Sequence, residues 1–169
     1  ASLLETDFEH RYIFANPLLK DVLLEKMDPE TKEDLCDQIA SYLQTSDENE
    51  EKVLYYLGRG SNPNACEHLL ELFEIQRLHC DYFEAKKTLE EVLNRFASGN
   101  PKLEKKVCCL LGELCNEAEN PKEAQSWLER SLTIEGEATW HAKAFEQQGA
   151  SFDQQGKLDE AKQAYQTAL

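Results

Sequence analysis

The chain has 169 residues, 41% of them hydrophobic and 30% charged, with a net charge of −15 at pH 7. This composition is that of a folded domain rather than a disordered tail, and no run of 18 apolar residues predicts a membrane span. Nucleic acids and anionic membrane surfaces would repel so acidic a chain, so we expect its partners to be proteins or peptides, basic ones included.

Six cysteines are present, but none forms a CxxC pair and no histidine pair has zinc-finger spacing. The sequence therefore predicts no structural zinc site. Cys108 and Cys115 are seven residues apart, on one face of a predicted helix, where a free cysteine acts as a small hydrophobic residue. The segment Ala1 to Glu5 lacks the form of a secretion signal. We expect a cytoplasmic, intracellular chain with reduced thiols.

Residues 3–14 favour a short strand hairpin over a helix. Tyr12, Ile13 and Phe14 alternate weakly with polar neighbours, and the pattern stops at Asn16. Because an isolated strand pair is only marginally stable, we expect this hairpin to pack on neighbouring elements.

The rest of the chain is predicted to be helical. Every proline follows Asn or Asp, and such a pair suits a helix start, since Asn and Asp are good N-caps and proline is tolerated at the first helical position. Glu123 follows Asn120 by three residues, as in a capping box. With the apolar spacing, these starts predict nine helices, at about residues 17–27, 29–45, 49–58, 63–79, 82–97, 101–117, 121–134, 139–154 and 158–169.

Residues 142–169 carry the most specific pattern. Gly149 and Ala161 lie at offsets where two antiparallel helices can touch, and aromatic residues such as Phe152 and Tyr165 surround that crossing. These offsets resemble the tetratricopeptide repeat (TPR), a 34-residue helical hairpin.

Two further segments show the same pattern less clearly. Residues 105–136 keep small residues at the same offsets, namely Gly112 and Ala124. Residues 66–97 match only weakly, because Phe73 stands where the other two segments have glycine. The resemblance implies an all-α fold, a right-handed α-solenoid of TPR-like helical hairpins over residues 16–169. The alternative is an ordinary amphipathic helical bundle. The last hairpin lacks a polar cap, so we expect a fragment of a longer array.

Residues 12–45 show a second resemblance. The run from Tyr12 to Leu23, with its Asn16-Pro17-Leu-Leu turn, is similar to the junction between a winged helix and a TPR-like arm in multidomain signalling (STAND-type) ATPases. It implies that residues 1–15 are the last hairpin of a winged-helix domain. Ala15 and Asn16 replace a basic residue and a histidine that this family often has there. No GxxxxGK[ST] loop occurs, so the ATPase itself is not in this chain.

No catalytic signature such as HExxH or GxSxG is present, so we predict no enzyme activity, no metal and no cofactor. The TPR resemblance implies binding of a protein or peptide, as a scaffold within a larger regulatory or signalling protein. The alternative is a sensor or autoinhibitory arm of a signalling ATPase, which binds a regulatory ligand or contacts a neighbouring domain.

The repeat offsets place the binding surface on the inner, concave face of the first helices. We expect this face to lean acidic, and we expect Glu113→Lys combined with Glu146→Lys to weaken binding without unfolding the protein. The predicted partner-binding residues are Glu74, Arg77, Lys106, Glu113, Asn116, Glu117, Lys143, Glu146 and Asp153.

Overall fold

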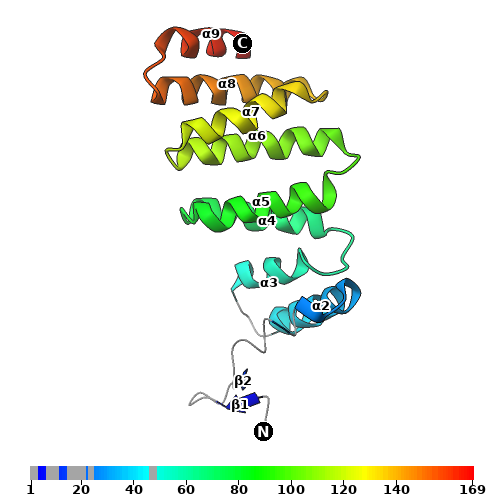
Figure 1. Cartoon of the computed structure of the whole chain (residues 1–169). Coiled ribbons are helices and arrows are strands. Elements are labelled where there is room, and N and C mark those ends of the chain that lie inside the picture. The colour runs from blue at the N-terminus through cyan, green and yellow to red at the C-terminus, as the bar shows by residue number, and fades with distance from the viewer. Residues whose placement is uncertain (1–3, 7–11, 15–21, 23–24, 46–48) are drawn as a thin grey trace. The chain divides into compact units, whose positions relative to one another are not determined.

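The computed structural model describes residues 4–6, 12–14, 22, 25–45 and 49–169 and divides the chain into two compact units, residues 1–62 and 63–169 (Figure 1). The first unit holds strands β1 (Leu4–Thr6) and β2 (Tyr12–Phe14) and helices α2 (Pro29–Thr45) and α3 (Glu50–Leu57). The second unit holds α4 (Ala65–Leu78), α5 (Tyr82–Phe96), α6 (Pro101–Glu117), α7 (Pro121–Thr133), α8 (Ala138–Gln154) and α9 (Leu158–Ala168). No helix of the described residues is both long enough and apolar enough to cross a membrane.

The N-terminal strand hairpin is confirmed. β1 and β2 pair antiparallel, with Leu4 opposite Phe14 and Thr6 opposite Tyr12. The first expected helix, residues 17–27, falls mostly on residues outside the described part of the chain.

In the first unit, α2 packs against α3, and the loop after α3 folds back onto α2. Asp37 of α2 accepts a hydrogen bond from the backbone N–H of Ser61 at 3.1 Å. A Cβ atom on Gly60 would lie 1.9 Å from the Asp37 carboxylate, so a larger residue there would move this carboxylate from its present position.

The predicted helix starts at proline are confirmed for α2, α6 and α7, where Pro29, Pro101 and Pro121 are the first helical residues. Helix α4 instead begins at Ala65, because Pro63 and the residue after it form a turn.

The predicted capping box at Asn120 is wrong. Its backbone N–H already bonds to the Cys115 carbonyl at 2.8 Å, closing the end of α6, so it does not bond to Glu123. The side chain amide of Asn120 donates to Glu123 Oε2 instead, at 2.7 Å.

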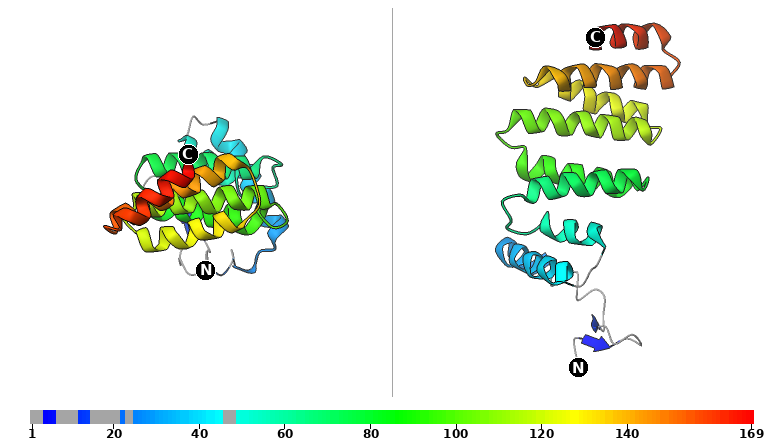
Figure 2. Two further views of the ribbon diagram at one scale, coloured as in Figure 1. Left: turned by 90° about the horizontal axis from the view of Figure 1, so that it is seen from above. Right: turned by 180° about the vertical axis from the view of Figure 1, so that it is seen from behind.

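Three helical hairpins make up the second unit: α4 with α5, α6 with α7, and α8 with α9. Successive hairpins stack in layers, α5 against α6 and both α6 and α7 against α8 (Figure 2). The first helix of each hairpin ends at a left-handed residue, at Cys80, Glu119 and Gly156, with φ of 59°, 56° and 72°. These positions are 39 and 37 residues apart, and the same separations divide the buried alanines Ala85, Ala124 and Ala161.

Gly112 and Gly149 lie where the two helices of a hairpin are in close contact. A Cβ atom on Gly112 would lie 2.5 Å from Leu128 Cγ, and one on Gly149 would lie 2.6 Å from the Tyr165 ring. In the weakly matched first hairpin, Phe73 takes the glycine position and is 1% exposed. One repeat register therefore runs through all three hairpins, which an ordinary bundle would not show. The all-α solenoid of TPR-like hairpins is confirmed.

Candidate functional site

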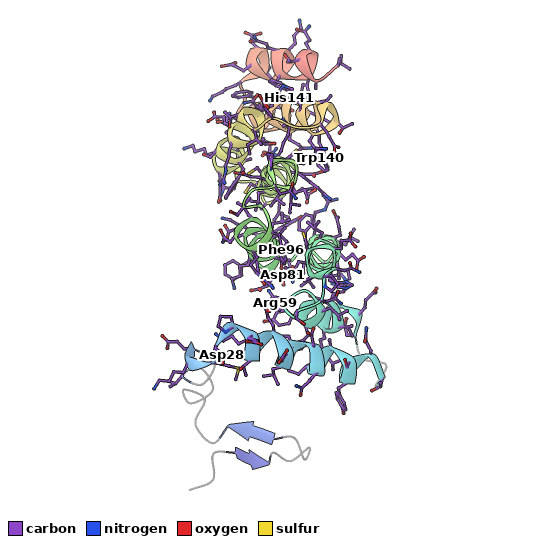
Figure 3. All side chains as sticks on the ribbon, turned by 90° about the vertical axis from the view of Figure 1, so that its right-hand side faces the viewer. Asp28, Arg59, Asp81, Phe96, Trp140 and His141 are labelled. Atoms are coloured by element: carbon purple, nitrogen blue, oxygen red, sulfur yellow. The ribbon has the colours of Figure 1, made fainter. Side chains whose placement is uncertain are left out.

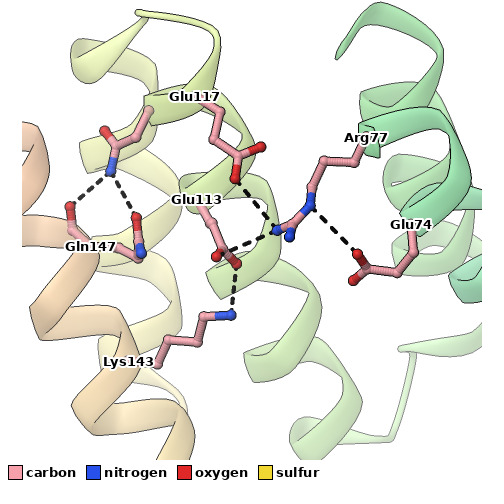
Figure 4. A network of polar contacts seen from close by, with 7 residues as sticks. Glu74, Arg77, Glu113, Glu117, Lys143 and Gln147 are labelled. Carbon is pink, nitrogen blue, oxygen red and sulfur yellow. Dashed lines mark hydrogen bonds and ion pairs between the residues drawn. The ribbon is translucent and has the colours of Figure 1, made fainter. Parts of the chain in front are cut away.

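Five charged side chains from the first helices of the three hairpins form one network (Figure 4). We call it the charge cluster; its members are Glu74 and Arg77 on α4, Glu113 and Glu117 on α6, and Lys143 on α8. Arg77 Nε lies 3.5 Å from Glu74 Oε2. One terminal nitrogen of the same guanidinium lies 3.4 Å from Glu113 and 3.5 Å from Glu117.

Glu113 is the centre of the charge cluster. Its side chain is only 15% exposed, and its second oxygen lies 2.7 Å from the Lys143 ammonium. One carboxylate thus links α4 and α8 to α6. We therefore correct the expectation that Glu113→Lys leaves the fold intact, because a lysine there would place three cations together in a largely buried position.

The charge cluster has three carboxylates and two cations, so it keeps a net charge of −1. Glu74 and Glu117 are its most exposed acids, at 51% and 36%. Burial raises the pKa of Glu117; Arg77 opposes this rise, and the neighbouring charges of Glu113 and Glu74 add to it. An additional cation beside Glu117 would therefore be favourable.

Asn116, another predicted binding residue, is buried between α6 and α8. Its side chain amide donates to the backbone oxygen of Gln147 at 2.8 Å and approaches the Gln147 side chain oxygen at 3.3 Å. Gln154 donates in turn to the Asn116 carbonyl at 3.1 Å. Asn116 thus positions the two helices and cannot itself touch a partner.

Trp140 connects Lys106 to the charge cluster, and the sequence pattern did not predict a role for this aromatic residue. The ammonium groups of Lys106 and Lys143 lie 5.8 and 5.5 Å from the centre of the Trp140 ring, within the range of a cation–π contact. Trp140 lies one helical turn before Lys143, and this spacing could have predicted that the two side chains are neighbours.

Glu146 and Asp153, the remaining predicted residues, are exposed on α8 and lie outside the charge cluster. Both lie near Tyr165, whose pKa is raised first by burial and then by these two negative charges. The structure thus brings five of the nine predicted residues into direct contact, and places Lys106 and Asn116 next to them.

Metal binding and thiol chemistry depend on the cysteine, histidine and acidic side chains. Within the described part of the chain no group of three or more His, Cys, Asp or Glu side chains could hold a metal ion. All six cysteines are free. Burial raises the pKa of Cys108 and Cys115 to about 11 and that of Cys109 to about 12, which suppresses the reactive thiolate.

Cysteine labelling should follow this burial. With iodoacetamide at pH 8, we expect exposed Cys80 to react quickly, while Cys108, Cys109 and Cys115 stay unmodified until the protein is unfolded. Mass spectrometry of tryptic peptides over a time course measures this. Labelling of any of the three α6 cysteines in the native protein as fast as Cys80 would mean that the α6 core is not formed.

The fold defines an all-α repeat protein of TPR-like type. No protein-family model matches the sequence, and no curated protein matches it. Among solved structures, it is similar to MamA residues 41 to the end from Desulfovibrio magneticus RS-1, at 22% identity and a TM-score of 0.55. It is also similar to a MamA RS-1 ArsTM double mutant, at 21% identity and a TM-score of 0.54. Each match covers 81% of this chain and 73% of the other, and at such identities the likeness shows the fold alone.

Proposed function

We propose that this chain is a scaffold that binds a basic protein or peptide segment through the charge cluster, as part of a larger regulatory or signalling protein. One observation carries the proposal: charged residues from three successive hairpins converge on Arg77 and Glu113 and keep one excess negative charge. Because stacked helices hold these side chains in place before binding, little conformational entropy is lost when a partner docks.

The basic character of the partner rests on the two exposed acids. Arg77 is shared among three carboxylates at 3.4–3.5 Å, so Glu74 and Glu117 are only loosely paired. A Lys or Arg side chain of a partner can approach these exposed carboxylates from solvent without displacing Glu113. The net charge of −15 adds long-range attraction for a basic segment.

Removing these two charges should weaken binding. Against a panel of fluorescent peptides of equal length and graded charge, we expect basic peptides to bind the native protein. We expect Glu74→Gln with Glu117→Gln to reduce their affinity about tenfold, a change of about 1.4 kcal/mol. Fluorescence anisotropy at low and moderate salt measures this, and the salt dependence should decrease in the variant because fewer charges attract the peptide.

The matched control makes the same change in net charge elsewhere. Glu71→Gln with Glu129→Gln neutralises two exposed acids outside the charge cluster and should leave peptide affinity nearly unchanged. Equal losses in both double variants would show a general charge effect and would refute the assignment of the charge cluster as the binding site.

We further propose that the chain acts by binding alone, without catalysis or a cofactor, and works in the cytoplasm. Six free thiols, Cys80 among them on the surface, suit a reducing compartment.

A second candidate function is the regulatory arm of a signalling ATPase. It is favoured by the strand at Tyr12–Phe14 ahead of α2, as expected for the winged-helix junction, whose intervening helix falls mostly outside the described residues. A GxxxxGK[ST] loop encoded ahead of residue 1 would support this role, and its absence from the complete gene would leave the scaffold function alone.

A further inference from the structure

Lys105 is a buried cation without a carboxylate partner. It lies on α6 and is 2% exposed, yet no Asp or Glu of the described residues lies within ion-pair distance of its ammonium. Lys86, Lys87 and Lys143, by contrast, each lie beside a glutamate. A buried charge without an opposite charge is costly in free energy, so other groups must compensate the charge of Lys105.

The contacts of the Lys105 ammonium leave one donor unused. It donates to the Ile134 carbonyl at 2.9 Å and lies 3.2 Å from His141 Nδ1. An ammonium carries three N–H groups, so one more acceptor can be bound. His141 belongs to the first turns of α8, close to Trp140 (Figure 3).

These groups line an open pocket of about 320 Å³ between α6, the end of α7 and the start of α8. The loop approaches the lysine closely, since a Cβ atom on Gly136 would lie 2.7 Å from Lys105 Cδ. Ser131 fixes the backbone of Lys105 by donating to its carbonyl at 2.9 Å. The residues that line the pocket are Lys105, Leu132, Thr133, Ile134, Glu135, Gly136 and His141.

We propose that this pocket is a binding site for a small oxyanion of the phosphate type. The anion supplies the negative charge that Lys105 lacks and accepts its third N–H, while the adjacent imidazole of His141 offers a further polar contact. Glu135, the one carboxylate among the lining residues, is exposed, and its negative charge repels the anion. A bound anion would join α6, the loop after α7 and α8, and so stiffen the stacking of the third hairpin on the second.

The test uses inorganic phosphate and the whole chain. At constant ionic strength, maintained with chloride, phosphate should produce saturable NMR shifts at the amides of Glu135, Gly136 and His141. The expected dissociation constant is roughly millimolar. The melting temperature should rise over the same concentration range, because a ligand that binds only the folded state stabilises it.

Three variants make the test specific. Lys105→Met should weaken phosphate binding at least tenfold, Glu135→Gln should strengthen it a few-fold, and Lys106→Met, one residue away and directed at Trp140, should leave it unchanged. If Lys105→Met does not fold, the shift map of the native protein and Glu135→Gln still decide the matter.

Two results would overturn the proposal. Shifts that chloride reproduces, or that spread over the surface, would mean that phosphate acts only through ionic strength. Loss of stability in Glu135→Gln without any phosphate effect would mean that Glu135 itself is the counterion of Lys105 in solution.

Discussion

Gly112→Ala is expected to destabilise the protein by about 1–3 kcal/mol, although alanine forms helices better than glycine does. The added Cβ atom would lie 2.5 Å from Leu128 Cγ, and the close crossing of α6 and α7 leaves Leu128 little space to move aside. Urea unfolding followed by circular dichroism measures the free energy of unfolding of the variant against that of the native protein.

A double-mutant cycle separates this clash from other effects. Leu128→Ala alone should cost about 2–5 kcal/mol, because Leu128 is fully buried and its loss leaves a cavity. Gly112→Ala with Leu128→Ala should cost clearly less than the two single losses combined, since the new methyl group occupies the vacated space. Strictly additive losses would mean that the two residues are not in contact and that the helices do not cross at Gly112.

Glu113→Gln is expected to cost about 2–3 kcal/mol, because it leaves Arg77 and Lys143 without the carboxylate that both contact in a largely buried position. The glutamine keeps the size of the side chain, so the loss reports the missing charge. Chemical denaturation at pH 7 measures it.

Glu117→Gln on the same helix is the matched control, and it is not expected to lower the free energy of unfolding. The pKa of Glu117 is raised in the folded protein, so its charged form is disfavoured there relative to the unfolded chain. Its contribution to stability therefore declines as pH rises through that pKa, and at pH 7 the neutral glutamine should be neutral or slightly stabilising. Similar losses for Glu113→Gln and Glu117→Gln would contradict the central role of Glu113.

Much of the fold can be predicted from local patterns in the sequence. Proline after Asn or Asp marks three helix starts correctly because both residues act within the first helical turn. The capping box at Asn120 fails because its N–H belongs to the turn that ends α6, a contact that no motif within α7 reveals. The first hairpin matches the repeat only weakly in sequence because a large residue, Phe73, takes the glycine position, and the structure accommodates it as a buried side chain.

Less of the candidate site can be predicted from the sequence. Repeat offsets place Arg77, Glu113 and Lys143 on the same face of successive helices. They are not at equivalent repeat positions, so the repeat pattern does not predict the ion pairs that join them. The burial of Asn116 and the pairing of Lys105 with His141 depend on how α8 and the loop before it pack on α6, and sequence spacing does not specify this packing.

The most direct test of the account is to map a basic peptide onto the protein by NMR. With a Lys- and Arg-rich peptide from the charge-graded panel, we expect saturable shifts concentrated at Glu74, Arg77 and Glu117, while Lys143 keeps its contact with Glu113. Shifts that centre on the second helices α5, α7 and α9, or no shifts at peptide concentrations where anisotropy reports binding, would contradict it.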